Sequence, residues 1–111
     1  MIDELTFRRH ADRAIESLMK SLIAAEEAGD FEVEEQSGAL NIVFEEPPAK
    51  FVITPNAPVR QIWISALSTS FKLDWSEDAG DFVFPKGSLT LKPLVAKLIN
   101  QHLGTESVVL A

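Results

Sequence analysis

The sequence contains no cysteine. This absence excludes disulfides, thiol catalysis, zinc–thiolate sites and iron–sulfur clusters held by cysteine. Basic residues are also few, because 10 lysines and arginines stand against 17 aspartates and glutamates, for a formal net charge of −7. A protein this acidic lacks the basic footprint that nucleic acid requires, and its charge favours cations or basic protein surfaces as partners. The simpler alternative is that the acidity serves solubility alone.

Long apolar runs are missing too. No uncharged apolar segment approaches the roughly 20 residues of a membrane-spanning helix. The first four residues, Met-Ile-Asp-Glu, lack the basic and apolar regions of a secretory signal. We therefore expect a cytoplasmic protein that does not associate with membranes. The 111 residues, of which 46% are hydrophobic, suit a single domain over residues 1–111.

One helix is predicted at the start of the chain. Apolar residues between Phe7 and Ala25 recur at intervals of three and four, which indicates a helix from about residue 3 to residue 28 with one apolar stripe. Asp3 or Thr6 can cap its beginning, and Gly29 can cap its end.

A second helix is predicted near the end of the chain. Thr90 is a good N-cap, and Pro93 falls in the first turn, where its missing N–H costs nothing. Gly104 ends this helix. The apolar residues 108–110 follow, and we expect them to lie in a groove between the two helices.

Between the helices, apolar and polar residues alternate. This pattern predicts about six short strands, with a turn at residues 55–58. Short strands at this spacing pair with their neighbours in antiparallel fashion. The predicted fold class is therefore α+β, a two-layer sandwich in which both helices pack on one face of an antiparallel sheet of about six strands. The other face is left to solvent.

Alternation in the fourth predicted strand decides which side chains reach this open face. Ile62 and Ile64 belong to the core, so Gln61, Trp63 and Ser65 face outward. An exposed tryptophan forgoes on the order of 1.5–3 kcal/mol of burial free energy. Tryptophan is also enriched at the energetic centres of protein interfaces. The alternative is that neighbouring side chains partly cover Trp63.

The remaining aromatic and imidazole groups have plainer interpretations. Trp75 shares a predicted face with Phe71 and Leu73, so we expect it in the core. His10 and His102 lie one on each predicted helix, and a solvated surface position is expected for both. A metal site built from the two is the alternative, although they lack a local ligand spacing.

Six carboxylates crowd the junction of the first helix and the first strand: Glu26, Glu27, Asp30, Glu32, Glu34 and Glu35. Carboxylate oxygens suit iron ions, and a surface cluster of them attracts cations. Acids at a helix C-terminus also oppose the helix dipole, a small cost that suggests a use. The alternative is a solvated charged face.

Nothing in the sequence indicates catalysis. Serine is frequent, but no nucleophile motif accompanies it, and the glycines are isolated turn residues that form no phosphate-binding loop. We therefore predict a protein that is not an enzyme and that holds no organic cofactor.

The segment around Trp63 resembles the signature of the frataxin family. It reads TPNAPVRQIWIS at residues 54–65, against a family pattern of Asn-x-Gln-x-Pro, two variable residues, and Gln-Ile/Val-Trp-Leu-Ala/Ser. Two positions depart, because Thr54 and Asn56 stand where the family has Asn and Gln. Residues 7–12, 72–75 and 87–91 resemble further family segments, the first of them in bacterial members, so the resemblance covers nearly the whole chain in order.

This resemblance implies a role in iron–sulfur cluster assembly. Frataxins bind iron weakly through an acidic ridge on the first helix and first strand. They also bind a cysteine desulfurase and the scaffold protein, and modulate sulfur transfer, with the sheet-face tryptophan in the contact surface. Weak binding of Fe²⁺ or Fe³⁺ is thereby implied for Glu26, Glu27, Asp30, Glu32 and Glu34. Partner binding is implied for Asn56, Gln61, Trp63, Ser65, Asp12 and Glu16.

The first helix departs from the family at positions that are typically acidic, which read Met19, Lys20, Ile23 and Ala24. Ile23 is expected to face solvent and Met19 to lie on the flank. The shortened ridge argues against strong or multi-site iron binding and leaves an apolar strip beside the acids. Two alternatives stay open: a ferrous iron chaperone or storage protein with weak ferroxidase activity, and a diverged interaction module outside cluster assembly. We expect a monomer.

Overall fold

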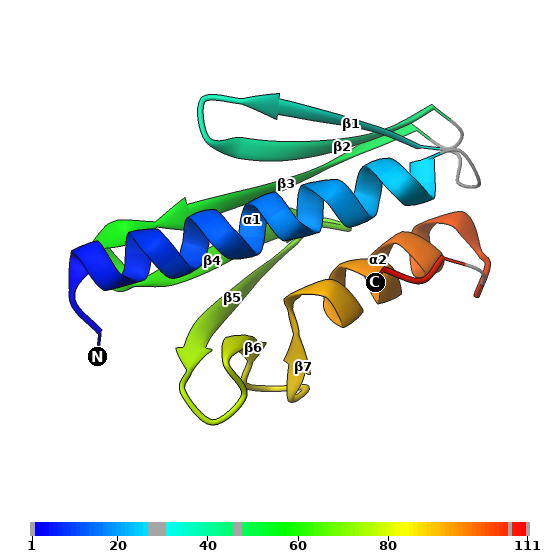
Figure 1. Ribbon diagram of the computed structural model, residues 1–111. Helices are drawn as coiled ribbons and strands as arrows, with labels where there is room; N and C mark the ends of the chain where they lie inside the picture. Colours follow the sequence, from blue (N-terminus) through cyan, green and yellow to red (C-terminus); the bar gives the residue numbers. More distant parts are fainter. Residues whose placement is uncertain (1, 27–30, 46–47, 107, 111) are drawn as a thin grey trace.

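The computed structural model describes residues 2–26, 31–45, 48–106 and 108–110. Helix α1 (Glu4–Glu26) precedes seven strands, and helix α2 (Leu91–Leu103) follows them. The strands are β1 (Phe31–Gln36), β2 (Ala39–Glu45), β3 (Pro48–Asn56), β4 (Gln61–Ala66), β5 (Thr69–Ser76), β6 (Asp81–Phe84) and β7 (Leu89–Thr90). They form one antiparallel sheet in which each strand lies beside its neighbours in sequence (Figure 1).

The two helices cover one face of this sheet, as predicted (Figure 1). The strand register places apolar side chains side by side on the helix-facing side, for example Ile53 opposite Ile64 and Ile62 opposite Leu73. The helices complete this core with two buried stripes: Phe7, Ala11, Ile15, Leu18 and Leu22 from α1, and Leu91, Leu94, Val95, Leu98 and Ile99 from α2. The α+β two-layer sandwich is therefore confirmed.

The sheet differs from prediction at two places. The seventh strand, β7, has only two residues and pairs with β6, so it is too short to show alternation. The turn predicted at residues 55–58 begins later, because β3 continues to Asn56 and a 3₁₀ turn, η1 (Ala57–Val59), follows it. Pro55 is tolerated in β3 because β2 pairs with this strand only as far as Ile53. Pro55 therefore has a strand partner on one side only, β4, and its missing N–H breaks no hydrogen bond to β2.

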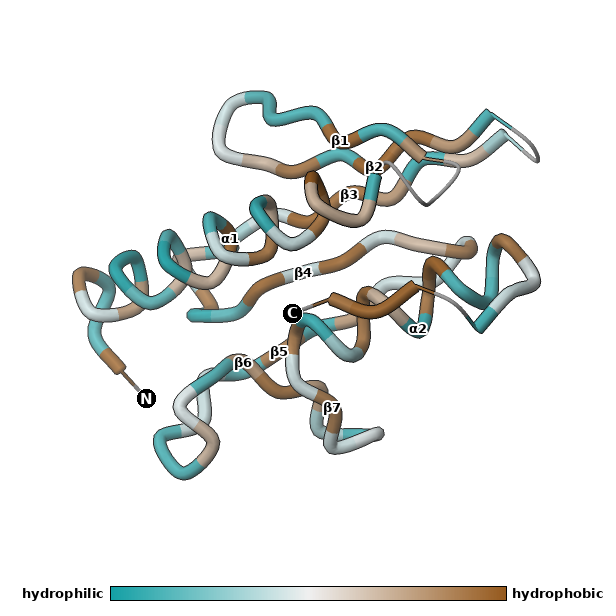
Figure 2. Tube along the Cα trace, turned by 45° about the vertical axis from the view of Figure 1, so that its right-hand side comes forward, coloured by the Kyte–Doolittle hydropathy of each residue, from teal (hydrophilic) through white to brown (hydrophobic). Residues whose placement is uncertain are grey.

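The C-terminal segment lies between α1 and α2, as expected (Figures 1 and 2). Val108 is only 7% exposed and belongs to the core. The side-chain amide of Asn100, on α2, binds the backbone of Val108 twice: Nδ2 donates to the carbonyl oxygen and Oδ1 accepts the N–H, both at 3.0 Å. Val109 points away and is 78% exposed. One side-chain amide thus fastens the segment to α2.

Both ends of α2 lie where the sequence predicted. Pro93 is in the first turn, and Gly104 adopts the left-handed conformation at the C-cap, with its N–H bonded to the carbonyl of Asn100. Thr90 precedes the helix, but its side chain makes no capping hydrogen bond. Gly29, the expected cap of the first helix, lies outside the described residues. Within the part of the chain described here, no helix is both long and apolar enough to cross a membrane.

Helix α1 begins with a side-chain cap. The N–H of Thr6 donates to Oδ1 of Asp3 at 2.7 Å. This hydrogen bond stabilises the ionised carboxyl and lowers the pKa of Asp3 below its usual value of 3.8, with smaller contributions from Arg60 and Arg9. Asp3, rather than Thr6, is therefore the N-cap.

The cap makes part of the stability depend on pH. Since the folded protein holds the pKa of Asp3 down, its contribution is complete above about pH 3.8 and is lost as the pH falls through the lower folded value. We expect Asp3→Ala to lower the thermal midpoint at neutral pH, and the gap to wild type to narrow in stronger acid. Thermal unfolding across pH measures this, with Asp3→Asn as the control that keeps a capping oxygen. A gap that stays constant with pH would contradict the assignment.

Candidate protein-binding surface

Trp63 lies on the face of the sheet that carries no helix. Its cross-strand neighbours are Thr54 on β3 and Lys72 on β5. The Lys72 ammonium nitrogen lies 4.9 Å from the centroid of the Trp63 ring, within cation–π range. The indole is half-buried, so the exposed tryptophan expected from the sequence is partly covered. Its predicted place on the open face is confirmed, and of the two alternatives for its exposure, partial cover by a neighbouring side chain, here Lys72, is the one observed.

A short chain of hydrogen bonds holds the indole in place. Nε1–H of Trp63 donates to Oε1 of Gln61 at 2.9 Å, and Nε2 of Gln61 donates to Oδ1 of Asp74 at 3.0 Å. An indole N–H can only donate, so the amide oxygen of Gln61 must face it and the amide nitrogen must face Asp74. The carboxylate on β5 thereby fixes the amide on β4, which fixes the ring.

The other predicted partner-binding residues of this region share the same face. Asn56 lies directly opposite Gln61, and Ser65 lies opposite Val52 and is exposed. Sequence reasoning missed Lys72 and Asp74. The sequence did indicate that Lys72 and Asp74 face outward, because their neighbours Phe71 and Leu73 face the core. Their pairing with Trp63 and Gln61 could not be predicted, because it depends on the register between β4 and β5.

The acidic residues separate into different environments. Glu32 and Glu34 are exposed on β1, opposite Val43 and Asn41, on the face of the sheet that also carries Trp63. Glu26 instead accepts the N–H of Val33 at 2.9 Å, so the last turn of α1 covers the outer edge of β1. Glu27 and Asp30, two further predicted iron ligands, lie outside the described residues.

A second group of acids lies between α1 and the β1–β2 turn. Asp12 and Glu16 on α1 and Glu35 on β1 line a hollow of about 350 Å³. Lys20 also lines it and pairs with Glu16 at 3.3 Å. Glu35 was not among the predicted site residues. It alternates in step with Phe31 and Val33 along β1, so its side chain faces the helix side of the sheet.

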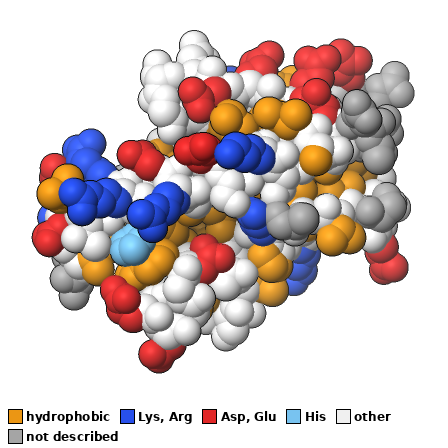
Figure 3. Space-filling view, viewed as in Figure 1, with side chains coloured by type: hydrophobic (Ala, Val, Ile, Leu, Met, Phe, Trp, Pro, Cys, Tyr) orange, Lys and Arg blue, Asp and Glu red, His pale blue; other side chains and the backbone are white. Residues whose placement is uncertain are grey.

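Charge is unevenly spread over the face shown in Figure 3. In the space-filling view, acidic side chains gather over the β1–β2 hairpin and basic side chains along α1 (Figure 3). Among the residues that the structure describes, no three carboxylate or imidazole groups come close enough together to form a metal site. Among the described residues, the predicted carboxylates Glu26, Glu32 and Glu34 thus do not form a shared metal site.

The apolar residues of α1 that stand where the family is typically acidic lie where the sequence placed them. Ile23 is 52% exposed, and Met19 is half-buried on the flank. Met19 also lines the hollow that holds Asp12 and Glu16. An apolar side chain therefore borders the acids, as predicted.

The histidines lie at the surface, as expected, but they are half-buried and not fully solvated. His10 stacks on Trp75, with centroids 3.7 Å apart and planes at 11°. His102 packs on Phe44, with centroids 4.4 Å apart, and on the edge of Phe51. Each imidazole packs at the margin of an aromatic cluster and keeps part of its surface exposed. Trp75 lies on the helix-facing side as expected, but it is half-buried at the rim of the core.

A family model describing the frataxin-like domain matches residues 1–105. The chain belongs to the frataxin-like family. Two solved frataxins share the fold. Frataxin from Psychromonas ingrahamii superposes with a TM-score of 0.78 at 16% identity, covering 94% of each chain. Yeast frataxin superposes with a TM-score of 0.69 at 21% identity, covering 89% of this chain and 81% of its own.

Curated relatives of this frataxin-like chain are bacterial proteins named iron-sulfur cluster assembly protein CyaY. That of Pseudomonas fluorescens is 27% identical over 77 residues, and that of Azotobacter vinelandii is 27% identical over 77 residues, each covering 69% of both chains. A Pseudomonas putida relative is 29% identical over 75 residues, covering 68% of this chain and 67% of its own.

Proposed function

We propose that this frataxin-like protein acts in iron–sulfur cluster assembly, by binding a cysteine desulfurase and its scaffold protein through the open sheet face. The observation that carries the proposal is the indole of Trp63, held on that face by the hydrogen bond to Gln61. The names of the CyaY relatives support the assignment to iron–sulfur cluster assembly.

The geometry of the face suits a protein partner. An aromatic ring is an effective interface anchor because it buries a large area, and a ring already fixed in position loses little conformational entropy on binding. Gln61 and Asp74 supply that fixation here. Asn56 and Ser65 are small polar residues on the same face of the sheet, and part of the Trp63 ring remains exposed there.

The acids add an electrostatic part to the same surface. Glu32 and Glu34 are exposed on β1 of the same sheet face. Carboxylates at the rim of an interface steer a basic partner and set its orientation. The desulfurase is therefore expected to present basic side chains to β1 and a pocket for the indole to β4. In this proposal the protein is a regulator of the desulfurase, not an enzyme.

Charge reversal tests this arrangement. We expect Glu32→Lys with Glu34→Lys to weaken desulfurase binding roughly 10-fold, with the loss shrinking at high salt because the pairs are solvent-exposed. Isothermal titration calorimetry at two salt concentrations measures it. Asp78→Lys with Glu106→Lys is the matched control, since both residues are exposed and the change in net charge is the same. If both double variants lost the same affinity for the desulfurase, net charge alone would explain the effect, and Glu32 and Glu34 would not belong to the binding site.

Iron is the second element of the proposal, as a weakly held cargo. The oxygen donors fit ferrous or ferric iron in kind, but the described carboxylates face different directions, with one oxygen of Glu26 bonded to the N–H of Val33. Asp12, Glu16 and Glu35 line one hollow, which Lys20 also occupies. Both features favour weak, surface binding.

Weak iron binding has an expected location. We predict that Fe²⁺ perturbs amide signals around residues 26–34 and leaves residues 20–24 little changed, because the latter carry no carboxylate. An anaerobic NMR titration measures this. Glu32→Gln with Glu34→Gln is expected to reduce the perturbation, and Asp78→Asn serves as the control. Perturbation centred on residues 20–24, or none, would contradict this part. Iron-dependent assembly with unchanged desulfurase binding would favour the storage alternative.

A further inference from the structure

A hollow of about 240 Å³ lies on the helix-covered side of the sheet, where α2 meets the β4–β5 and β6–β7 hairpins. It is somewhat smaller than most small-molecule sites, which run from roughly 300 to 1,000 Å³. Large apolar side chains from all three elements line it. They are Leu67, Phe71, Phe84, Leu89, Leu94 and Leu98. The hollow is therefore mainly apolar and has room for one small molecule.

The wall formed by the two hairpins is aromatic and already in place. The rings of Phe71 and Phe84 meet edge to face, with centroids 5.4 Å apart and planes at 72°. Both rings pack against the core and yet are only half-buried, as are Leu67 and Leu89 beside them. A ligand ring added to this pair would remove apolar surface from water and make a further aromatic contact.

Gly87 keeps the hollow open. Its φ lies outside the left-handed region, so the backbone of the β6–β7 turn does not require a glycine at this position. A Cβ there would lie 3.5 Å from Cδ2 of Phe84 and 3.9 Å from the Leu89 side chain, which is ordinary van der Waals contact. A larger residue would thus fit the turn and take up part of the hollow. The glycine leaves that space to a ligand.

The one charged group of the described lining is a cation, Lys97. It is exposed and lies on the same face of α2 as Leu94 and Gln101, at intervals of three and four residues. Lys97 pairs with no carboxylate among the residues that the structure describes. The side-chain amide of Gln101 can donate a further hydrogen bond. Although the net charge of the protein is −7, the rim of this hollow therefore favours an anionic group.

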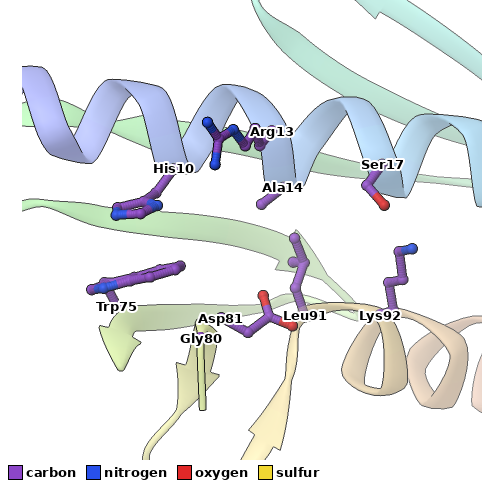
Figure 4. Close-up of a pocket in the computed structure, with 9 residues that line it drawn as sticks. All are labelled: His10, Arg13, Ala14, Ser17, Trp75, Gly80, Asp81, Leu91 and Lys92. Atoms are coloured by element: carbon purple, nitrogen blue, oxygen red, sulfur yellow. The ribbon is translucent and has the colours of Figure 1, made fainter. Parts of the chain in front are cut away.

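The hollow beside His10 and Trp75 differs in kind (Figure 4). It is larger, at about 330 Å³, and polar or charged side chains line it from α1 and from β6, among them Arg13, Ser17 and Asp81. An apolar ligand group placed there would take charged side chains out of water, which costs free energy. Of the two hollows, the smaller one is thus suited to an apolar ring next to a single anionic group.

We propose that the smaller hollow binds a small arylcarboxylic acid, one aromatic ring that carries a short carboxylate arm. The ring packs against Phe71 and Phe84, and the carboxylate lies toward Lys97 and Gln101. No residue of the open sheet face lines this hollow, so its ligand binding is independent of partner binding through Trp63.

Titration with phenylacetate tests the site, read by the methyl signals of the full chain. The Leu89 and Leu94 signals are expected to shift saturably at millimolar ligand through the ring current of the bound phenyl group, while the indole signal of Trp75 stays unchanged as an internal reference. Gly87→Val is expected to weaken binding at least ~10-fold, because its side chain fills part of the hollow. Ala79→Val is the matched control at another exposed turn. No saturable shift, or equal losses in both variants, would overturn the proposal.

The carboxylate is tested separately. Lys97→Gln keeps most of the side chain but removes the charge, and it is expected to weaken phenylacetate binding ~3-fold at low salt, the size of an exposed ion pair. Lys50→Gln is the matched control, since Lys50 is exposed on the other face of the sheet. Equal losses in these two variants would overturn the proposal.

Two further ligands separate the ring from the charge. Phenethyl alcohol keeps the ring but is uncharged, and it is expected to bind the wild-type protein ~3-fold more weakly than phenylacetate and to be insensitive to Lys97→Gln. Acetate keeps the charge but lacks the ring, and it is expected to cause no shift at the same concentration. If phenethyl alcohol bound as tightly as phenylacetate, the hollow would be a plain apolar pocket. If acetate did, it would be a plain anion site. Either result would overturn the proposal.

Discussion

Replacing Trp63 by alanine is expected to weaken binding to the cysteine desulfurase–scaffold complex by at least about 2 kcal/mol, or ~30-fold, the size of loss typical of an aromatic residue at an interface centre. The ring lies on the open face with one edge bonded to Gln61 and Lys72 beside it, so removing it leaves a gap that a partner cannot fill. Calorimetry with the purified complex measures the loss.

Two controls separate the ring from its fixation. Leu5→Ala removes an exposed apolar residue of α1, on the other layer of the molecule, and should leave binding unchanged. Asp74→Ala keeps the indole but frees Gln61, so an intermediate loss is expected if orientation matters. Unchanged binding by Trp63→Ala, with the fold intact by circular dichroism, would remove Trp63 from the interface.

Replacing Asn100 by alanine is expected to destabilise the protein by roughly 2–3 kcal/mol. Two hydrogen bonds to the backbone of Val108 are lost, each contributing about 0.5–1.5 kcal/mol. The freed segment then withdraws part of the buried Val108 side chain from the core. Urea denaturation, read by circular dichroism, measures the change in unfolding free energy.

The neighbouring residue supplies a matched control for this prediction. Gln101 is exposed and adjacent on the same helix, so Gln101→Ala should change stability by less than about 0.5 kcal/mol. Val108→Ser detaches the same segment by another route. If Asn100 acts by holding this segment, the variant that combines Asn100→Ala with Val108→Ser should lose less unfolding free energy than the sum of the two single losses. Fully additive losses would mean that the two residues act separately.

The regular part of the fold could be predicted from periodicity. The stripe of α1 and the inward isoleucines of β4 follow from the spacing of apolar residues alone, and so does the outward position of Trp63. The two-residue β7 could not be predicted, because so short a strand has no pattern and exists only through its pairing with β6. Pro55 in β3 depended on where β2 stops pairing, which is again tertiary information.

The sequence predicted which residues lie on the open face, but it did not predict the contacts between them. Parity alone places Gln61 and Trp63 on one face, but the Gln61–Asp74 bond and the position of Lys72 depend on the register between β4 and β5. For the same reason His10 was assigned to solvent. Its ring stacks on a residue 65 positions away, and no local pattern carries such a contact.

The acidic residues show the same limit. Their number near the junction of α1 and β1 was evident from the sequence, but their directions were not. Glu26 turned out to cover a strand edge, while Glu35 turned toward Asp12 and Glu16. A run of like charges predicts a local potential, whereas convergence on one ion depends on the packing of helix against strand.

In the proposed function the open sheet face, and not the helix layer, contacts the desulfurase. The two tryptophans are built-in probes of these surfaces, because Trp63 lies on the open face and Trp75 on the helix-facing side. The most direct measurement follows both ¹⁵N indole signals as unlabelled desulfurase is added. If the open face is the contact, the Trp63 signal shifts or broadens first while the Trp75 signal changes little. A change confined to Trp75 would contradict it.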